Sequence, residues 1–280
     1  MALRVVHGVH SRLRTGTSVT LQNNKSLGQH WLKDPDVLAD IADVADLTPE
    51  DTVLEVGPGL GTLTSRLLAR VGRVVAVEFD DNLARKLPGQ FPGKNLEVIN
   101  QDILKFNTSA LPRDYKAVAN VPYYITSKII QHLSESSNPP KTMVLLIQKE
   151  VAERLAAQPG DYSILAVSAQ IYYRVELGQV VAAELFTPPP KVHSQVVVMH
   201  RLDSPLVAVA ERDNFFHLVK AGFSAKRKKL RSSLAGGLHL DKTVVESLLA
   251  DAQIPADARA EDLSIDQWLT LLKKYDIMKG

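Results

Sequence analysis

The sequence predicts an α/β protein: a mostly parallel sheet with helices on both faces, followed by a smaller all-helical C-terminal domain. Short apolar runs typical of buried strands alternate with segments of helical spacing between residues 52 and 157. A glycine-rich turn joins the first run to the helical segment after it. Beyond about residue 204 the helical segments follow one another with no strand pattern between them.

The elements of the sheet domain are expected in strict alternation. Each strand is a short apolar run, and the segments between the runs carry helical spacing. The strands are placed at 52–56, 73–79, 96–99, 117–119 and 143–147, and the helices at 63–71, 83–87, 125–133 and 150–157.

Three consecutive prolines at 188–190 predict a stiff, extended loop, and a late strand is expected at 192–199. Four helices should follow, at 215–221, 226–234, 244–249 and 265–273. We therefore divide the chain into a tail at 1–25, a sheet domain at 26–203 and a helical domain at 204–280.

The composition limits the classes of protein that this chain can belong to. Hydrophobic residues make up 45% of the 280 residues, which is ample for a sizeable core. No cysteine is present, which excludes disulfides and thiolate metal sites. The histidines show no spacing typical of metal ligands, so we expect no metal. The longest apolar run, 143–147, is far too short to cross a bilayer, and no membrane partner is expected.

The net charge is only +2, but the basic residues are unevenly distributed. No acidic residue precedes Asp34, whereas five basic residues do: Arg4, Arg12, Arg14, Lys25 and Lys33. This segment is a solvated tail with some RNA contact, an RNA-binding arm or an organellar transit peptide. We expect a cytoplasmic protein unless residues 1–25 are a transit peptide.

The glycine-rich turn at 55–61 reads Glu-Val-Gly-Pro-Gly-Leu-Gly. Its glycines, Gly57 and Gly59 among them, allow a sharp turn and a close approach of the backbone to a ligand. Their spacing differs from the dinucleotide-binding fingerprint. With Glu55 in front, the turn resembles the first motif of S-adenosylmethionine methyltransferases, in which this loop faces the amino-acid end of the cofactor.

Two further acidic residues follow the next two strands. Glu78 ends the second strand, where a carboxylate accepts hydrogen bonds from ribose hydroxyls, and Asp102 is placed to accept one from an adenine amine. The alternative is a tight turn with two helix caps. Three such features in order on three successive strands favour a site for S-adenosylmethionine.

The segment Asn120-Val121-Pro122-Tyr123 follows the fourth strand. It resembles the loop of methyltransferases that act on amino groups of bases. The adenine amine is a poor nucleophile because its lone pair is delocalised. The oxygen of Asn120 and the carbonyl before Pro122 can accept its two N–H groups, and Tyr123 can stack on the base. An ordinary strand-to-helix turn explains Asn and Pro but not the aromatic pair that follows.

Phe186 precedes the proline loop. A rigid aromatic there is a candidate for the second wall of the base pocket. The alternative is a plain core aromatic.

With these motifs in place, the chain after Lys25 resembles the KsgA-type ribosomal RNA adenine dimethyltransferases. The resemblance rests on residues 26–32, on Phe186 with 188–194, and on 222–231. Leu27 and Trp31 replace the phenylalanines usual in the first element. The resemblance implies that the cofactor is contacted by Gln29, His30, Leu32, Gly57, Gly59, Glu78, Asp102 and Asn120.

The resemblance also implies a reaction and a partner. That family dimethylates two adjacent adenines in a hairpin near the 3′ end of small-subunit rRNA, within a partly assembled small ribosomal subunit. Residues 26–203 would then be the methyltransferase domain and 204–280 a helical RNA-binding domain, and we expect a monomer. Two alternatives are an Erm-like enzyme of the large subunit and a non-catalytic assembly or transcription factor.

A basic cluster lies in the third element of the resemblance. On a helix these residues would spread around the cylinder, so a solvated face is one interpretation. Phosphate contact, which positions RNA without reading its sequence, is the other. The cluster consists of Lys226, Arg227, Lys228, Lys229 and Arg231.

Overall fold

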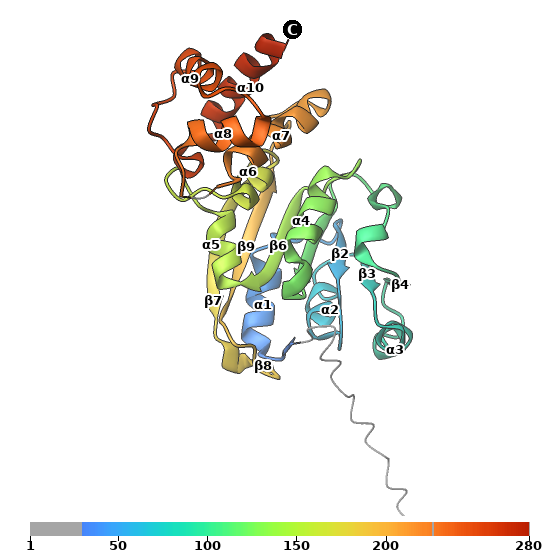
Figure 1. Ribbon diagram of the computed structural model, residues 1–280. Coiled ribbons are helices and arrows are strands. Elements are labelled where there is room, and N and C mark those ends of the chain that lie inside the picture. Colours follow the sequence, from blue (N-terminus) through green and yellow to red (C-terminus); the bar gives the residue numbers. More distant parts are fainter. Residues whose placement is uncertain (1–29, 226, 280) are drawn as a thin grey trace, which may run out of the picture.

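The computed structural model describes residues 30–225 and 227–279. Its centre is a seven-stranded sheet with the order β4-β3-β2-β5-β6-β9-β7 (Figure 1). The first five strands of the chain in this sheet are parallel, and β9 is antiparallel to both its neighbours. The strands are β2 (Thr52–Val56), β3 (Arg73–Glu78), β4 (Leu96–Asn100), β5 (Lys116–Asn120), β6 (Thr142–Gln148), β7 (Tyr173–Val181) and β9 (Ser194–Arg201).

The five strands expected in the first part of the chain are confirmed, with shifts of at most one residue at their ends. The late strand begins at Ser194 rather than at residue 192. The strand β7 was not predicted, because this edge strand is largely exposed on one side and lacks a continuous apolar run. Neither was the two-residue pair of β1 (Trp31–Leu32) and β8 (Phe186–Thr187).

Helices cover both faces of the sheet. They are α1 (Pro35–Asp43), α2 (Thr62–Leu67), α3 (Asp81–Lys86), α4 (Thr126–Glu135), α5 (Lys149–Leu155) and α6 (Ile164–Gln170). Of these, α1 and α6 were not predicted, and α2 ends four residues earlier than expected. Asp34 caps α1, because its Oδ1 accepts from the backbone N–H groups of Asp36 and Val37 at 3.1 and 3.0 Å.

Alternate residues of the strands point to opposite faces and so belong to two separate apolar clusters. Val53, for example, packs in the cluster that contains the buried residues of α1 and α2. Its neighbour Leu54 packs in the larger cluster on the other face, which contains the buried residues of α4. The parallel sheet is therefore buried on both sides, as the strand composition indicated.

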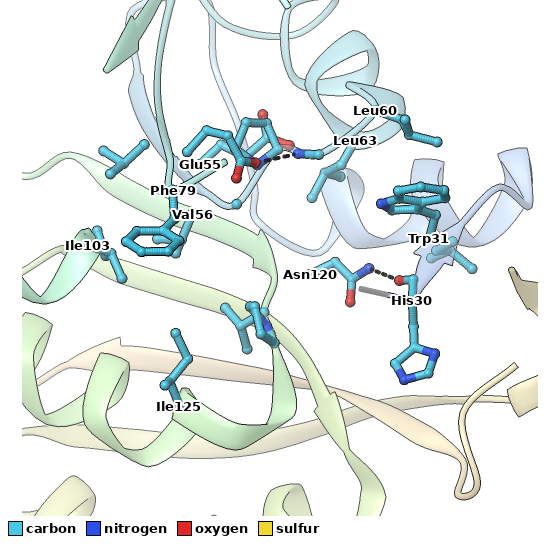
Figure 2. A pocket seen from close by; sticks show the side chains of 18 of the residues that line it. His30, Trp31, Glu55, Val56, Leu60, Leu63, Phe79, Ile103, Asn120 and Ile125 are labelled. Carbon is cyan, nitrogen blue, oxygen red and sulfur yellow. Dashed lines mark hydrogen bonds between the residues drawn. The ribbon is translucent and has the colours of Figure 1, made fainter. Parts of the chain in front are cut away.

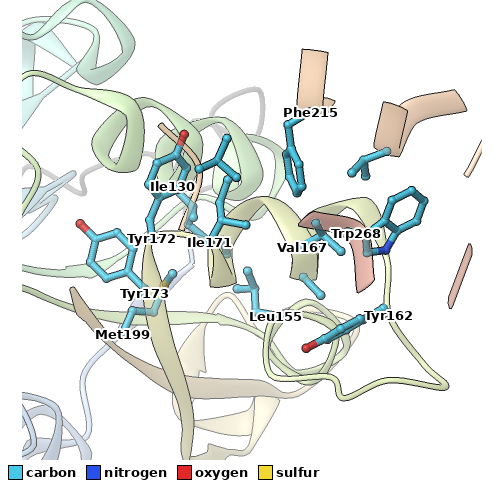
Figure 3. Close-up of a cluster of buried hydrophobic side chains, with 14 of the residues drawn as sticks. Ile130, Leu155, Tyr162, Val167, Ile171, Tyr172, Tyr173, Met199, Phe215 and Trp268 are labelled. Atoms are coloured by element: carbon cyan, nitrogen blue, oxygen red, sulfur yellow. The ribbon is translucent and has the colours of Figure 1, made fainter. Parts of the chain in front are cut away.

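The chain ends in four helices: α7 (Arg212–Gly222), α8 (Leu230–Leu238), α9 (Lys242–Asp251) and α10 (Ile265–Lys279). No strand follows Arg201 in the part of the chain that the structure describes. Phe215 and Trp268 are fully buried in the cluster that also holds Val167 and Ile171 of the α6 region (Figure 3). One continuous core thus links these helices to the sheet, and the division at residue 203 stays a prediction.

One helix begins later than the sequence analysis expected. The segment 226–234 was taken as helical throughout, but α8 starts only at Leu230. Residues 227–229 lie before it in a turn, where Lys229 occupies the N-cap position with extended backbone angles. The basic cluster is therefore mostly on a turn, and the expectation that it spreads around a helix was wrong.

The strand order fixes where a ligand can bind. From β2 the chain proceeds to β3 and β4 on one side, and then to β5 and β6 on the other. The loops that leave the carboxyl ends of β2 and β5 therefore diverge and open a crevice between them. The glycine-rich turn follows β2 and the Asn120 loop follows β5, so both motifs meet at this crevice.

Candidate active site

A cavity lies at the carboxyl ends of the parallel strands, between the loops after β2, β3, β4 and β5 (Figure 2). The segment around β1 closes one side of it. Nine predicted site residues line this single cavity: His30, Leu32, Gly57, Gly59, Glu78, Asp102, Asn120, Pro122 and Tyr123. Gln29, also predicted to contact the cofactor, lies outside the described residues.

The glycine-rich turn requires glycine for its backbone angles. Gly57, Gly59 and Gly61 have φ values of +64°, +57° and +78°, in the left-handed region. A Cβ at Gly59 would lie 3.4 Å from the indole nitrogen of Trp31, which shows how closely β1 approaches the turn. The turn thus presents bare backbone to the cavity.

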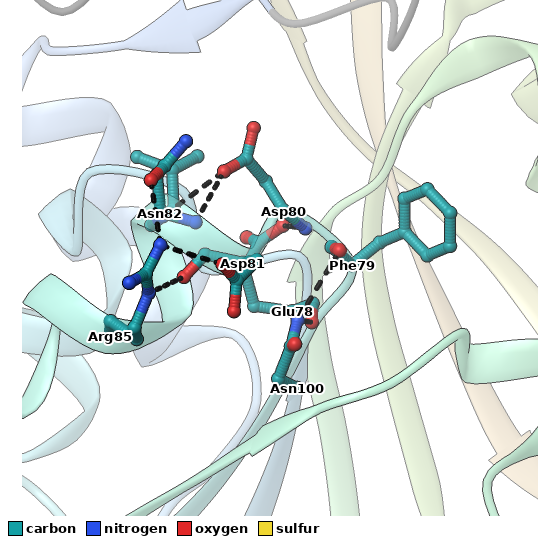
Figure 4. A network of polar contacts seen from close by, with 8 residues as sticks. Glu78, Phe79, Asp80, Asp81, Asn82, Arg85 and Asn100 are labelled. Carbon is teal, nitrogen blue, oxygen red and sulfur yellow. Dashed lines mark hydrogen bonds and ion pairs between the residues drawn. The ribbon is translucent and has the colours of Figure 1, made fainter.

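Glu78 ends β3, and its carboxylate accepts hydrogen bonds from the loops that follow β2 and β3. Its Oε2 accepts from the backbone N–H of Gly59 at 3.0 Å, and its Oε1 accepts from that of Asp80 at 2.8 Å (Figure 4). The residue is only 6% exposed, and burial raises the pKa of its carboxyl against these hydrogen bonds. Each oxygen keeps a further lone pair for a ligand hydroxyl.

Glu55 lies deeper in the same cavity, and sequence analysis gave it no separate role. It is 1% exposed, and its Oε2 accepts a hydrogen bond from the hydroxyl of Thr64 at 2.6 Å. Burial raises the pKa of the Glu55 carboxyl to about 8, and the nearby charge of Glu78 acts in the same direction. At neutral pH this carboxyl is therefore mostly protonated.

Asp102 caps a short helix, which was the alternative interpretation of this residue, and it also borders the cavity. Its Oδ1 accepts from the backbone N–H of Leu104 at 3.0 Å and so caps a short 3-10 helix. The residue also lines the cavity. The cap fixes the side chain and leaves its other oxygen as an acceptor.

Two apolar residues of the cavity wall were not singled out beforehand. Phe79 is 63% exposed although it is aromatic, and Ile103 lies near it in the cavity (Figure 2). Each follows one of the predicted acidic residues directly, Glu78 and Asp102. Two apolar surfaces beside hydrogen-bond acceptors suit a flat heterocycle such as adenine. The signal for Phe79 in the sequence was an aromatic residue directly after the acidic residue that ends a strand.

The side-chain amide of Asn120 is oriented by the β1 segment. Its Nδ2 donates to the backbone carbonyl of His30 at 3.3 Å (Figure 2). Because a carbonyl can only accept, the amide nitrogen must face His30. The Oδ1 of Asn120 is then left to accept hydrogen bonds, which is the role that the sequence predicted for it.

Tyr123 is fixed from two directions. Its hydroxyl lies 2.6 Å from the Oγ of Ser194, and its ring stacks with that of His30 at a centroid distance of 5.8 Å. The imidazole Nδ1 of His30 lies 2.8 Å from the carbonyl oxygen of Pro188. Direct contacts therefore connect the loop after β5, which contains Tyr123, with the β1 segment and the proline loop, although the three are far apart in the sequence.

Phe186 does not form a wall of this cavity, and the expectation is corrected. Its side chain is 2% exposed and does not line the cavity. The reason is the pairing of β8 with β1, which sets Phe186 opposite Leu32 and buries both in the same apolar cluster. Phe186 is a core aromatic residue, which was the alternative interpretation. Among the tyrosines, Tyr123 and Tyr124 line the cavity instead.

The basic cluster lies away from the cavity. Arg227, Lys228 and Lys229 are exposed in the turn before α8, and Lys226 lies outside the described residues. Arg231 forms an ion pair with Glu246 at 2.7 Å. The three exposed cations are available to an anionic partner, whereas the charge of Arg231 is partly compensated.

Residues 30–225 and 227–279 contain no group of three or more His, Asp or Glu side chains arranged to hold a metal ion. No helix among them is both long enough and apolar enough to cross a membrane.

A sequence profile described as ribosomal RNA adenine dimethylase matches residues 20–276. Ribosomal RNA small subunit methyltransferase A of Dehalococcoides mccartyi strain CBDB1 is 44% identical over 260 residues, which cover 91% of this chain and 89% of the relative. The protein of the same name from Alkaliphilus metalliredigens strain QYMF is 41% identical, covering 90% and 91%.

Two solved structures share most of the fold. A dimethyladenosine transferase from Plasmodium falciparum has a TM-score of 0.77 and 27% identity, covering 89% of this chain and 98% of its own. The 23S rRNA methyltransferase ErmE has a TM-score of 0.71 and 31% identity, covering 88% and 99%. A match of that extent reaches past residue 203. The helical tail alone therefore does not separate small-subunit from large-subunit enzymes.

Proposed function

The chain belongs to the ribosomal RNA adenine dimethylase family, and from this membership we propose that it dimethylates the N6 amines of two adjacent adenines in the 3′-terminal hairpin of small-subunit rRNA, with S-adenosylmethionine as methyl donor. One observation carries the chemistry. The acceptor oxygen of Asn120 and the ring of Tyr123 border the same cavity as Glu78 and the bare glycine turn.

The cavity fits S-adenosylmethionine by its donors and acceptors. The glycine turn leaves backbone exposed, Glu78 offers lone pairs to ribose hydroxyls, and Phe79 supplies an apolar surface beside them. Glu55 places a carboxyl at the end of the cavity beside the turn. When bound, this cofactor supplies a methyl group on a cationic sulfur. Residues His30, Leu32, Gly57, Gly59 and Asp102 complete the proposed cofactor site.

The residues on the other side of the cavity orient the base. Asn120 Oδ1 accepts one N–H of the adenine amine, and the carbonyl of Val121, before Pro122, accepts the other. Both bonds draw the nitrogen towards tetrahedral geometry and direct its lone pair to the methyl group. Tyr123 packs against the ring of the base after it has left its stack. Positioning and electrostatics provide the acceleration, so no strong base is required.

The choice of the small subunit follows from the named relatives. The 44% and 41% identical relatives are both small-subunit methyltransferases by name. The similarity to ErmE, at 31% identity, supports a second candidate, methylation of large-subunit rRNA. Both candidates use the same cofactor and base loops, so only the product distinguishes them.

The experiment is to incubate the purified protein with unmethylated small and large ribosomal subunits and tritium-labelled S-adenosylmethionine. Label in two adjacent adenines of the small-subunit rRNA is the expected result. Label in the large subunit alone would support the second candidate. Binding to subunits without methyl transfer to either of them would indicate a non-catalytic assembly factor.

Three finer points belong to the same proposal. Arg227, Lys228 and Lys229, with Lys226 and Arg231 beside them, contact rRNA phosphates. The protein acts as a monomer, because its substrate is far larger than itself. The bacterial origin of the named relatives supports a cytoplasmic location.

A further inference from the structure

Tyr124 is a large aromatic residue that the proposed reaction does not use. It lines the cavity beside Tyr123, yet 61% of it is exposed. Most other tyrosines of the described chain are buried; Tyr115, Tyr172 and Tyr173 are 1–3% exposed. An aromatic side chain that stays in solvent at the mouth of a cavity is a candidate binding surface.

The backbone fixes the position of Tyr124. The N–H of Ile125 donates to the carbonyl of Pro122 at 3.3 Å, and the hydroxyl of Thr126 donates to the same carbonyl at 3.3 Å. These bonds close a tight turn that leads directly into α4. Tyr124 therefore stands on rigid backbone, which is what a stacking platform requires.

The exposed face of α4 continues from Tyr124. Residues Ser127, Lys128 and Gln131 are exposed, at spacings of three, four and seven, whereas Ile129, Ile130 and Leu133 are buried. Tyr124 lies in the 3-10 turn just before α4, and Lys128 lies in the first turn of that helix, four positions further along the chain. Both exposed side chains therefore belong to the short segment that leads from the mouth of the cavity into α4.

Lys128 has no salt-bridge partner among the described residues. By contrast, Lys149 at the start of α5 is paired with Glu153 at 2.9 Å. An exposed cation four positions along the chain from an exposed aromatic ring matches the two parts of a nucleotide. The ring suits a base and the ammonium group suits a phosphate.

We propose that Tyr124 and Lys128 form a subsite for the nucleotide next to the reacting adenine in a single-stranded segment of RNA, with Tyr124 stacked on its base and Lys128 paired with a phosphate. This inference rests on the proposed function. Only the reacting base enters the cavity, so the strand must pass over its mouth. Because the proposed targets are adjacent, one adenine occupies this subsite while the other reacts.

The test compares Y124A, Y124F and K128A with wild type and with the control K94A. Lys94 is also exposed, but it lies before the amino end of β4, at the opposite edge of the sheet from the cavity. Affinity for unmethylated small subunits is measured across a salt series, and affinity for S-adenosylmethionine is measured separately. Thermal melting verifies that each variant is folded.

We expect Y124A to weaken subunit binding about fivefold to a hundredfold, the range for one stacked base, and Y124F to retain it. K128A should lower the slope of log affinity against log salt by about one, and K94A should not. Cofactor affinity should stay unchanged in all variants.

Two results would overturn the subsite. One is that Y124A and K128A bind subunits as K94A does, and the other is that Y124A chiefly weakens cofactor binding. A failure of the proposed function itself is distinct, because wild type would then transfer no methyl group to either subunit.

Discussion

The hydroxyl of Tyr123 and the Oγ of Ser194 lie 2.6 Å apart, although 71 positions separate them in the chain. Ser194 is fully buried at the start of β9, and burial raises the pKa of the Tyr123 hydroxyl, which is therefore neutral when it forms this bond. The bond ties the proposed base-stacking ring to a strand whose position the sheet fixes.

Removal of the Ser194 hydroxyl should free the Tyr123 ring without disturbing the cofactor side. We expect S194A to lower kcat about fivefold, because a hydrogen bond contributes roughly 1 kcal/mol to holding the ring. The Kd for S-adenosylmethionine should not change. S194T, which keeps a hydroxyl, should recover part of the activity.

A double-mutant cycle isolates this pair. If the bond is the only role of both hydroxyls, Y123F and the Y123F/S194A double variant should have equal kcat values. Additive losses would show that Ser194 acts independently of Tyr123.

Asn120 should be essential for transfer but not for cofactor binding. N120A removes the acceptor for the adenine amine and should abolish methylation of small subunits, while equilibrium binding of S-adenosylmethionine stays largely intact. N95A is a suitable control, because Asn95 binds the carbonyl of Gly72 at the amino end of β4. Unchanged turnover in N120A would refute the assigned role.

Cofactor binding should strengthen as the pH rises through the pKa of Glu55, about 8. At pH 7 the buried carboxyl is mostly neutral, and only its ionised form attracts a cationic ligand. Between pH 7 and 9 the Kd for S-adenosylmethionine should fall by up to about tenfold. Titration calorimetry measures this, and E55Q should remove the dependence that comes from this group.

The same group should affect stability in the opposite sense. Its pKa in the fold exceeds its ordinary value of 4.5, so the folded state binds the proton more tightly. Its contribution to the free energy of unfolding is complete below pH 4.5 and is lost as the pH rises towards 8. In urea titrations without ligand, the free energies of unfolding of wild type and E55Q should therefore converge at low pH and separate as the pH rises towards 8. The other carboxyls are common to both proteins, so E55Q provides the baseline for their contribution.

Charge reversal in the turn before α8 should weaken rRNA binding. K228E/K229E should reduce affinity for small subunits and lower its salt dependence, because two phosphate contacts are lost. R231A should have a smaller effect, since Arg231 is paired with Glu246. K273E, on the exposed side of α10, serves as the control. Equal binding by all variants would identify the turn as a merely solvated surface.

Gly61 and Gly57 should respond differently to alanine. Both have positive φ, which costs about 1 kcal/mol in a residue with a side chain. A Cβ at Gly61 would also lie 2.8 Å from Cδ1 of Leu87, whereas one at Gly57 meets nothing within 4 Å. Denaturant unfolding should therefore show a larger loss of stability, by roughly 1–3 kcal/mol, for G61A than for G57A.

The strands and the cavity residues could be predicted because their signals are local. A run such as Thr52–Val56 followed by glycines predicts a strand and a turn without reference to any other segment. Parallel strands then bring their carboxyl ends together, so Glu78, Asp102 and Asn120 had to meet at one edge. The edge strand β7 carried no such signal, because only its pairing with β9 makes it a strand.

Phe186 shows the limit of this reasoning. Its place before the proline loop favoured the cavity, but the direction of its side chain depends on the two-residue pair of β8 with β1. The basic cluster is a second case. Helical spacing in 226–234 was visible, yet Lys229 lies at the N-cap and the helix starts only at Leu230.

The sequence by itself determined the five parallel strands, the residues of the cofactor turn and the type of reaction, because each depends on neighbours within a few positions. The tertiary structure decided which groups hold those residues in place. Contacts such as Tyr123 with Ser194 and Asn120 with His30 join segments that are 71 and 90 positions apart. No local pattern encodes such contacts, since they form only when the sheet brings the segments together.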